Sequence, residues 1–435
     1  MLELKIENIA LDQIRAYARN AKEHPERQIQ QMAASIKEFG FNNPILVDGD
    51  GEIIAGHGRL EAAKLVGLAT VPIIRLPHLS EAQKRAYRVA DNKIALNSGW
   101  NLDLLRLEIF ELEEICEDMD ISITGFDSVE IDVLMDIDER SADPKVNAIP
   151  YIPEDEIVSK SGDIWQIGEH RVICGDSLNS ETFEKLLVGK QVDMVLQDAP
   201  YNCKIQGHVC GSGTIKHKEF AMASGEMSAD EFTNFLRTNF ALCAKFSKPG
   251  SLHMNFMDWR NLRQITTAGS DVFSSLVNMC VWVKSSGGMG SLYRSQHEIC
   301  FVFKNGREPH TNNVELGKNG RYRTNVWQYA GVNSFGHNKE NLKLHPTVKP
   351  VEMLKDAILD VSKRGQIILD SFLGSGSTLI AAHKAKRICY GIEFEPLYID
   401  TTIRRFRDLF GIDAIHEQSG KTYSELLAAK QGGVK

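Results

Sequence analysis

Residues 367–382 have the sequence IILDSFLGSGSTLIAA, in which a strand, a glycine turn and a helix follow one another. The β-branched run ends at Asp370, and the turn Gly374-Ser375-Gly376 opens directly into the helical pattern. Glycines let a ligand approach the backbone closely, and the free amides at a helix start favour polar or anionic groups. This stretch therefore predicts a ligand-binding turn in an α/β fold.

A second strand, RICYGIEF, follows this unit and ends in Glu393, 23 residues after Asp370. In nucleotide-binding α/β folds, an acid about 20 residues after the turn binds the ribose hydroxyls. Strand, turn, helix, strand and acid together predict a nucleoside-containing cofactor. The turn lacks the GxGxxG pattern of dinucleotide sites, so a smaller nucleoside such as S-adenosylmethionine fits it better.

The same alternation of strands and helices extends from residue 158 to about residue 412. Amphipathic helices, such as those predicted for 228–246 and 350–364, lie between short apolar strands. The strand candidates are VDMVLQ, SLHMNF, NMCVWV, HEICFVF, QIILDSF and RICYGIEF. This alternation predicts an α/β domain with a mostly parallel sheet that helices cover on both faces.

The strand VDMVLQ runs directly into Asp198-Ala199-Pro200-Tyr201. The carboxyl edge of a parallel sheet is where this architecture builds its sites. An Asp-x-Pro sequence is also common in ordinary loops, so this segment taken alone indicates a plain turn.

Taken together, the segments resemble the β-class DNA amino-methyltransferases. Asp198-Ala-Pro-Tyr201 resembles their Asp-Pro-Pro-Tyr catalytic motif, and residues 370–378 resemble their cofactor loop, usually Asp-Pro-Phe-x-Gly-Ser-Gly-Thr-Thr. His345-Pro-Thr-Val-Lys-Pro350 resembles the segment that precedes this loop in the permuted class. The resemblance runs from about Gly162 to Leu409. It implies a Rossmann-like, S-adenosylmethionine-dependent methyltransferase domain in the circularly permuted β-class order.

The resemblance also implies direct in-line transfer of a methyl group to the exocyclic amine of a flipped base. Asp198 and the backbone carbonyl of Ala199 would accept hydrogen bonds from the amine, and Tyr201 would stack on the base. Pro200 restricts the residue before it to extended conformations. The residues implied to bind S-adenosylmethionine are Asp176, His345, Thr347, Lys349, Asp370, Phe372, Gly374, Gly376, Thr378 and Glu393.

The first residue of the catalytic motif bears on the target base. Asp198 favours N6 of adenine, which makes a site-specific adenine DNA methyltransferase the leading prediction. An N4-cytosine enzyme on the same scaffold is the nearest alternative, since those enzymes more often carry Ser there. Ala199 and Ser371 replace prolines of the family motifs. Ala199 supports another alternative, a non-catalytic DNA-binding or partition-type protein with a degenerate methyltransferase domain. Methylation of RNA or of protein glutamine is a further alternative.

Two stretches between the motifs, within about 285–341, are predicted to form the target-recognition region. One is glycine-rich, and the other is basic and rich in Asn, Arg and Tyr, which read base edges and phosphates. A pair of ordinary long loops is the alternative. The predicted DNA contacts are Tyr293, Arg294, Arg321 and Arg323.

The net charge of −8 is unevenly distributed along the chain. Residues 103–157 contain 18 acidic and three basic side chains, which leaves +7 for the remainder. This balance permits binding to double-stranded DNA without proving it.

The first 100 residues resemble the ParB/sulfiredoxin fold, a small α+β domain. Asn43-Pro-Ile-Leu-Val47 and the segment GHGRLEAA that begins at Gly56 carry the resemblance. Gly56, His57 and Arg59 lie at a helix start that could hold a phosphate, so a nucleotide is one predicted ligand. Gly58 stands where many members have Arg, and an accessory DNA-docking module is therefore the favoured interpretation.

The remaining segments complete the predicted domain organisation. Residues 101–157 are predicted to form an acidic helical segment followed by an interdomain linker with three prolines. Residues 158–412 form the predicted methyltransferase domain, and 413–435 a C-terminal tail.

Cysteine usage and hydropathy bear on location. The eight cysteines are scattered without a CxxC pair, which indicates reduced thiols and a cytoplasmic protein. No apolar run approaches the roughly 20 residues that span a bilayer. The spacings of Cys203, His208, Cys210 and His217 fit no standard zinc finger, so no metal is predicted.

The resemblance allows a homodimer and a restriction-modification role, and it leaves open whether a restriction enzyme accompanies the protein.

Overall fold

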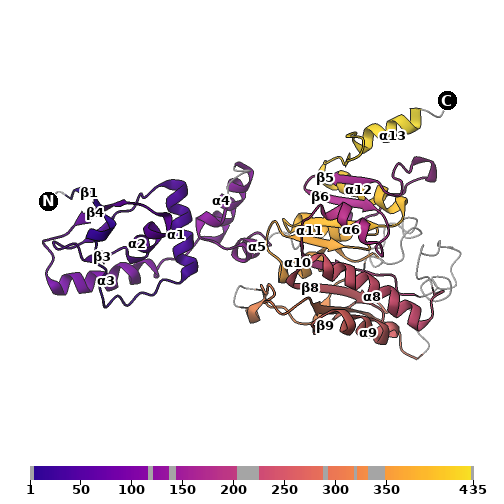
Figure 1. Ribbon diagram of the computed structural model, residues 1–435, viewed down its shortest axis with the longest axis horizontal. Helices are drawn as coiled ribbons and strands as arrows, with labels where there is room; N and C mark the ends of the chain where they lie inside the picture. Colours follow the sequence, from indigo (N-terminus) through magenta and orange to yellow (C-terminus); the bar gives the residue numbers. More distant parts are fainter. Residues whose placement is uncertain are drawn as a thin grey trace. The chain divides into compact units, whose positions relative to one another are not determined.

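The structure is a computed structural model that describes residues 4–115, 121–136, 144–202, 225–287, 292–317, 321–331 and 348–432. The chain divides into two compact units, Met1–Ile137 and Asp138–Lys435 (Figure 1). Each unit has its own sheet and its own core. Within the described ranges, no helix is both long and apolar enough to cross a membrane.

The first unit is built on a four-stranded sheet with the order β1-β4-β2-β3. Its strands are β1 (Ile6–Ala10), β2 (Ile45–Val47), β3 (Ile53–Ala55) and β4 (Thr70–Arg75). The sequence DGDG at residues 48–51 connects β2 to β3, and the two strands pair antiparallel as a hairpin. The pairing of β2 with β4 is parallel, and that of β1 with β4 is antiparallel.

Five α-helices belong to the described part of the first unit. They are α1 (Glu26–Phe39), α2 (His57–Val66), α3 (Glu81–Ala95), α4 (Leu102–Ile115) and α5 (Ser128–Asp136). Gly67 caps the carboxyl end of α2 in the left-handed region, at a φ of 80°. Ser80 caps α3 through a reciprocal capping box with Gln83, as its sequence predicts.

The second unit contains a ten-stranded sheet in its described residues, with the order β11-β9-β10-β8-β7-β12-β13-β6-β5-β14. The strands are β5 (Ile164–Ile167), β6 (His170–Cys174), β7 (Val192–Gln197), β8 (Ser247–Met257), β9 (Ser275–Val283), β10 (His297–Lys304), β11 (Val326–Gln328), β12 (Ile367–Asp370), β13 (Ile388–Glu393) and β14 (Ile415–His416). Parallel pairing joins the central strands from β8 through β7, β12 and β13 to β6. Antiparallel pairs such as β9–β10 and β5–β6 flank them. The predicted parallel sheet is thus confirmed at the centre, and it is mixed towards its edges.

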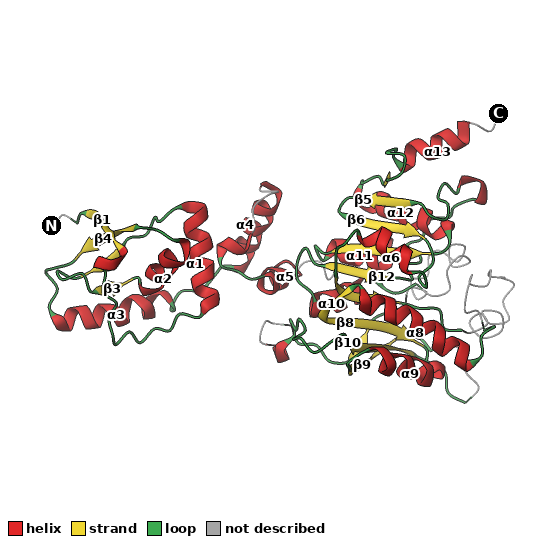
Figure 2. Ribbon diagram, viewed as in Figure 1, coloured by secondary structure: helices red, strands yellow, loops and turns green. Residues whose placement is uncertain are grey.

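Helices cover both faces of this sheet, as the alternating pattern predicts (Figure 2). One face packs against α6 (Ser180–Leu187), α8 (Ala229–Lys245) and α9 (Leu262–Val272). The other packs against α10 (Val351–Val361), α11 (Ser377–Lys384) and α12 (Pro396–Phe410). A short helix, α13 (Tyr423–Gly432), follows β14. Burial of both faces explains why the central strands are continuous apolar runs.

The segment that follows residue 143 is fixed on the second unit, although it reads as a linker. The carbonyl of Val146 accepts a hydrogen bond from Arg405 Nη2 at 2.7 Å. The carboxylate of Asp400 accepts from the backbone amides of Val158 and Ser159 at 2.6 and 3.0 Å. Prolines and a lack of periodicity predict a segment without long helices or strands. They do not show whether the segment forms hydrogen bonds with residues distant in the sequence.

Candidate active site

A cavity lies at the carboxyl ends of β7, β12 and β13. Because β12 pairs with both neighbours in parallel, the residues that follow these strands meet at one edge of the sheet. The lining includes ten of the predicted residues: Asp198, Ala199, Pro200, Tyr201, Lys349, Asp370, Phe372, Gly374, Thr378 and Glu393. Apolar walls complete it, contributed by Leu196, Phe256, Leu354, Leu373 and Tyr398.

Asp198 is held in a compact cluster of charged and hydroxyl groups. Its carboxylate forms a very short ion pair with the Lys349 ammonium, and the Tyr201 hydroxyl lies 2.7 Å from Asp198 Oδ1. Glu298 completes the cluster, with Oε2 lying 3.0 Å from the Tyr201 hydroxyl and 3.1 Å from Lys349 Nζ. The second oxygen of Glu298 pairs with Lys284. Tyr201 has one hydroxyl proton, so it can donate to only one of the two carboxylates at a time.

The charges in this cluster shift each other's pKa values. Burial raises the pKa of Asp198, and the attraction of Lys349 only partly opposes this effect. Burial also raises the pKa of Glu298, but Lys349 and Lys284 outweigh it and leave the pKa below its usual value. Burial lowers the pKa of Lys349, and the two carboxylates reverse this and raise it. Lys349 is therefore a cation that contacts the carboxyl groups of both Asp198 and Glu298.

The sequence does not single out Glu298, which comes from β10 and reaches the cavity edge from outside the recognised motifs. Its one sequence signal is an acid at the start of an otherwise apolar strand, HEICFVF. An acid on a central strand is rarely buried without a partner, so this position could have been noted as a candidate.

The glycine turn and Glu393 are joined by backbone hydrogen bonds. Gly374 N donates to Glu393 Oε2 at 2.8 Å, and Glu395 N donates to Glu393 Oε1 at 2.9 Å. Gly374 and Gly376 have φ values of 55° and 81°, which favour glycine. A Cβ atom at Gly376 would also come within 2.6 Å of the Thr402 side chain.

Both carboxyl groups at the strand ends have unusual pKa values. Burial raises the pKa of Asp370 to about 7, although the Thr378 hydroxyl and the Phe372 amide favour its ionised form. Burial likewise raises the pKa of Glu393 to about 7, although the amides of Gly374 and Glu395 favour its ionised form. Both groups therefore change charge near neutral pH.

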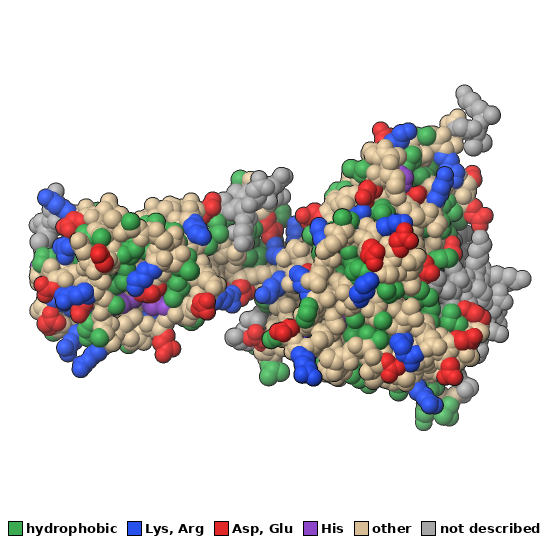
Figure 3. Space-filling model, viewed as in Figure 1, with side chains coloured by type: hydrophobic (Ala, Val, Ile, Leu, Met, Phe, Trp, Pro, Cys, Tyr) green, Lys and Arg blue, Asp and Glu red, His purple; other side chains and the backbone are tan. Residues whose placement is uncertain are grey.

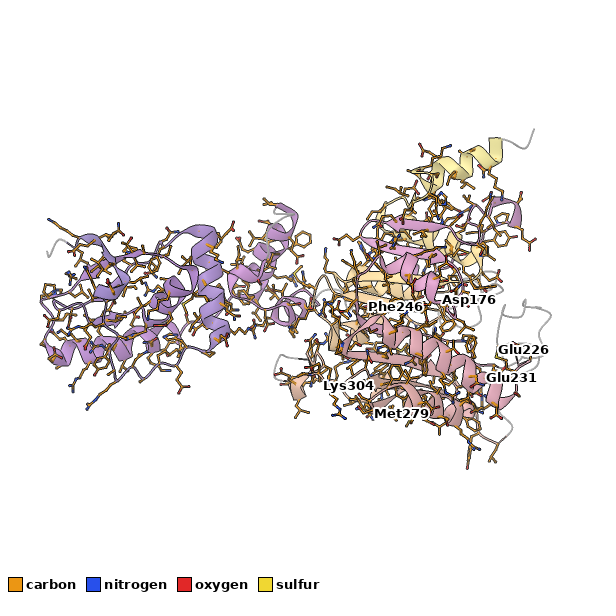
Figure 4. All side chains as sticks on the ribbon, in the orientation of Figure 1. Asp176, Glu226, Glu231, Phe246, Met279 and Lys304 are labelled. Atoms are coloured by element: carbon orange, nitrogen blue, oxygen red, sulfur yellow. The ribbon has the colours of Figure 1, made fainter. Side chains whose placement is uncertain are left out.

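Some predicted cofactor residues lie elsewhere. Asp176, labelled in Figure 4, follows β6 and accepts a hydrogen bond from Leu178 N at 2.8 Å. Its neighbours Gly175 and Ser177 line the cavity. His345 and Thr347 lie outside the described residues, as do Cys203, His208, Cys210 and His217.

Arg321 and Arg323, predicted to contact DNA, point into the second unit instead. Arg321 is buried and donates to Asp360 Oδ1 at 2.8 Å and to Asp356 Oδ1 at 3.1 Å. Arg323 donates to the other oxygens of the same two carboxylates and to the Tyr329 hydroxyl. Both guanidinium groups form ion pairs with carboxylates inside the second unit, so we do not propose Arg321 and Arg323 as DNA contacts.

Tyr293 and Arg294 are exposed, in contrast to the buried Arg321 and the partly buried Arg323. The side chain of Tyr293 is 85% exposed, and Arg294 Nη2 donates to the carbonyl of Gly287 at 2.6 Å. On the face of the molecule shown in Figure 3, Lys and Arg side chains are interspersed with Asp and Glu. Tyr293 and Arg294 therefore remain the predicted DNA contacts.

The helix start that could hold a phosphate in the first unit is already partly occupied by protein contacts. Gly56 precedes α2 with a φ of 107°. His57 Nε2 accepts from the Tyr17 amide at 3.3 Å, and burial lowers the pKa of His57. Arg59 Nη1 donates to the carbonyls of Asn43 and Pro44 at 2.7 and 2.8 Å. A phosphate at this helix start would meet the neutral imidazole of His57. It would also meet a guanidinium group that already donates to two backbone carbonyls.

Three families match successive parts of the chain. Residues 3–93 match the ParB N-terminal domain, 103–161 the ParB-methyltransferase HTH domain, and 192–404 the N6/N4 DNA methylases. The helix-turn-helix match begins in the predicted acidic helical segment and includes α4 and α5. The sequence analysis predicts the first of these two helices, but it does not predict a helix-turn-helix domain.

Individual relatives resemble different parts of the chain. The ParB-like nuclease domain-containing protein YnaK of Escherichia coli (strain K12) is 46% identical over 83 residues, covering 19% of this chain and 95% of YnaK. The type II methyltransferase M.HpaI of Haemophilus parainfluenzae is 22% identical over 273 residues, covering 59% of this chain and 81% of M.HpaI. The crystal structure of an M1.HpyAVI–SAM complex is 19% identical, with a TM-score of 0.41, and the match covers 54% of this chain and 97% of that one.

The family matches agree with the layout of the cavity, since the matched methylase region holds both the Asp198 segment and the glycine turn. The predicted resemblance to amino-methyltransferases with a ParB-like N-terminal domain is confirmed. The chain carries an N6/N4 DNA methylase domain, which follows a ParB N-terminal domain and a ParB-methyltransferase helix-turn-helix domain.

Proposed function

We propose that this DNA methyltransferase transfers a methyl group from S-adenosylmethionine to N6 of adenine in duplex DNA. One observation carries the proposal: the Asp198–Tyr201 segment and the glycine turn with Glu393 line the same cavity. A target amine held by Asp198 would then lie next to a nucleoside held by the turn. An Asp at the first motif position supports adenine over cytosine.

The cavity suits S-adenosylmethionine by the chemistry of its lining. Glu393 and Asp370 provide carboxylates for hydroxyl groups, and Phe372, Leu373 and Tyr398 provide apolar surface for a purine ring. S-adenosylmethionine supplies a methyl group on a positively charged sulfur. The several acidic side chains around the cavity favour such a cation.

The protein contributes by orienting the amine and accepting its hydrogen bonds. We assign this role to Asp198 and to the backbone carbonyl of Ala199, while Tyr201 stacks on the flipped base. The Asp198 carboxylate must remain ionised to accept a bond from the amine. Lys349 favours the ionised form and partly offsets the rise in the pKa of Asp198 that burial causes.

The direct test is the transfer of labelled methyl from S-adenosylmethionine to duplex DNA of varied sequence, followed by nucleoside analysis. We expect N6-methyladenine from the wild type and a loss of at least roughly 10³-fold in Asp198→Ala, since the amine loses its acceptor. N4-methylcytosine as the product would contradict the adenine assignment. Cofactor binding without transfer to any DNA would favour a non-catalytic DNA-binding protein.

Cofactor affinity should depend on pH through Glu393. Its raised pKa of about 7 leaves the carboxyl protonated below neutrality, whereas ribose hydroxyls donate best to the ionised form. Affinity should therefore rise about tenfold between pH 6 and pH 8, because the ionised fraction rises by that factor. Isothermal titration calorimetry across this range measures the slope. The Glu393→Gln variant should bind more weakly with a shallower slope, and an unchanged slope would exclude Glu393 as the titrating group.

The remaining predicted contacts are proposals of the same kind. We assign Tyr293 and Arg294 to the DNA interface and treat the first unit as an accessory module for DNA or a nucleotide. The proposal of a homodimer rests on the family resemblance alone.

A further inference from the structure

A buried polar network crosses the base of the cavity between β7, β12 and α8. Its central residue is Gln197, the last residue of β7. Gln197 Oε1 accepts from Ser371 Oγ at 2.5 Å, and Gln197 Nε2 donates to Asn239 Oδ1 at 2.9 Å. Asn239 Nδ2 closes the ring by donating to Ser371 Oγ at 2.9 Å. We call these three residues the amide bridge.

The amide bridge has one hydrogen-bonding arrangement. Gln197 Nε2 uses its second hydrogen on Asn255 Oδ1 at 2.7 Å, and Asn239 Nδ2 uses its second on the Ser177 carbonyl at 3.2 Å. Gln197, Asn239 and Ser371 are each at most 1% exposed, so no solvent replaces a lost partner. Turning the Gln197 amide over would bring its oxygen against the acceptor oxygens of Asn239 and Asn255. Turning the Asn239 amide over would bring its nitrogen against the donor Gln197 Nε2. The network therefore holds its members in fixed orientations.

The amide bridge begins where the backbone pairing of the two strands ends. The parallel ladder of β7 and β12 pairs Ile368 with Met194 and ends with the pair of Leu369 and Val195. Two residues further along, the Ser371 hydroxyl binds the Gln197 amide across the same strand boundary. The side chains thus continue a connection that the backbone no longer makes.

The positions of these residues in the chain connect the two halves of the site. Gln197 immediately precedes Asp198, and Ser371 immediately follows Asp370 at the start of the glycine turn. Ala199 and Ser371 both stand where the family motifs carry proline. A proline would fix φ at these strand ends, and this chain lacks that restriction at both positions. The hydroxyl of Ser371 is available for the amide bridge only because residue 371 is not proline.

We propose that the amide bridge is a positioning device that fixes Asp198 relative to the cofactor turn. Its members act through Asp198 and the turn, and Asn239 does not line the cavity. The inference rests on the proposed methyl transfer, because its consequence is the alignment of amine and methyl donor. A displacement of about 1 Å in such an alignment can lower turnover by about 10²-fold.

The test compares Ser371→Ala and Asn239→Ala with Ser362→Ala in the full chain. Ser362 is a matched control, because it is fully buried and its hydroxyl also has two partners, Ile358 O at 2.5 Å and Arg387 Nε at 3.1 Å. Ser362 lies outside the cavity lining. Steady-state transfer assays give kcat and KM for S-adenosylmethionine, and thermal unfolding gives the stability of each variant.

We expect both bridge variants to lose about tenfold or more in kcat with KM changed less than about threefold. The control should lose comparable stability and keep its kcat. Equal kcat in Ser371→Ala and Ser362→Ala would overturn the inference while leaving the proposed function intact. A loss in Ser371→Ala that Asn239→Ala does not share would also overturn it, since Ser371 would then act by direct contact. A wild type that transfers no methyl group refutes the proposed function, and the inference falls with it.

Discussion

The Lys349→Met variant is expected to lose roughly 10²-fold in kcat at pH 7 and to recover part of it as the pH rises. Lys349 forms the ion pair that opposes the effect of burial on Asp198. Without this cation, Asp198 shares a buried cluster with Glu298 and its pKa rises further. A carboxyl with a raised pKa is neutral below that pKa, so activity should be lost towards acid and regained towards alkali. Single-turnover rates between pH 6 and pH 9 measure this shift.

Lys284→Met is the matched comparison, because Lys284 pairs with Glu298, whereas Lys349 pairs with both Glu298 and Asp198. Removing it should shift the pH profile in the same direction by a smaller amount. A Lys349→Met variant with the wild-type pH profile would show that Lys349 does not set the charge of Asp198. Cofactor affinity, measured on the same variants, separates this effect from simple loss of binding.

Arg321→Ala is expected to destabilise the second unit by about 3 kcal/mol. The substitution leaves Asp360, itself buried, with only Arg323 as its cationic partner among the described residues. An uncompensated buried charge is costly because water cannot reach it. Thermal unfolding of the full chain should therefore show an earlier transition for this unit, followed separately from the first unit.

Arg294→Ala provides the control for this prediction, because Arg294 is an exposed arginine of the same predicted recognition region. It should change stability by less than about 0.5 kcal/mol while weakening DNA binding and reducing its salt dependence. The prediction would be contradicted if Arg321→Ala kept the stability of the wild type and bound DNA more weakly with less salt dependence. Arg321 would then be a DNA contact.

The parts of the site that local sequence determines could be predicted. The turn at Gly374–Gly376, the strand ending in Asp198 and the acid Glu393 each carry a short-range signal. Strand periodicity and the parallel order then place their ends together without further information. The capping box of α3 and the hairpin of β2 and β3 are equally local.

The rest depends on partners that are distant in the sequence. Arg321 and Arg323 look like DNA contacts because composition shows their charge, whereas Asp356 and Asp360, which neutralise them, lie more than 30 residues away. Glu298 is likewise brought to Asp198 by strand pairing alone.

The helix-turn-helix segment is a different case, because its second helix did carry a local signal. Asp127 and Glu130 form a reciprocal cap, in which Glu130 N donates to Asp127 Oδ1 and Asp127 N donates to Glu130 Oε2. This Asp-x-x-Glu spacing before an apolar run predicts a helix start. The many other acidic side chains of residues 103–157 make this one Asp-x-x-Glu spacing hard to distinguish.

The strand order also has a consequence for biosynthesis. The first unit's sheet uses strands that all lie before residue 76, so it can fold while the ribosome is still making the chain. In the second unit, β6 and β7 must wait for β12 and β13, which emerge about 200 residues later. Contacts of such sequence separation form slowly and leave apolar strands exposed in the meantime. A ribosome-bound chain shorter than about 390 residues therefore cannot modify DNA, because the two halves of its site have not yet met.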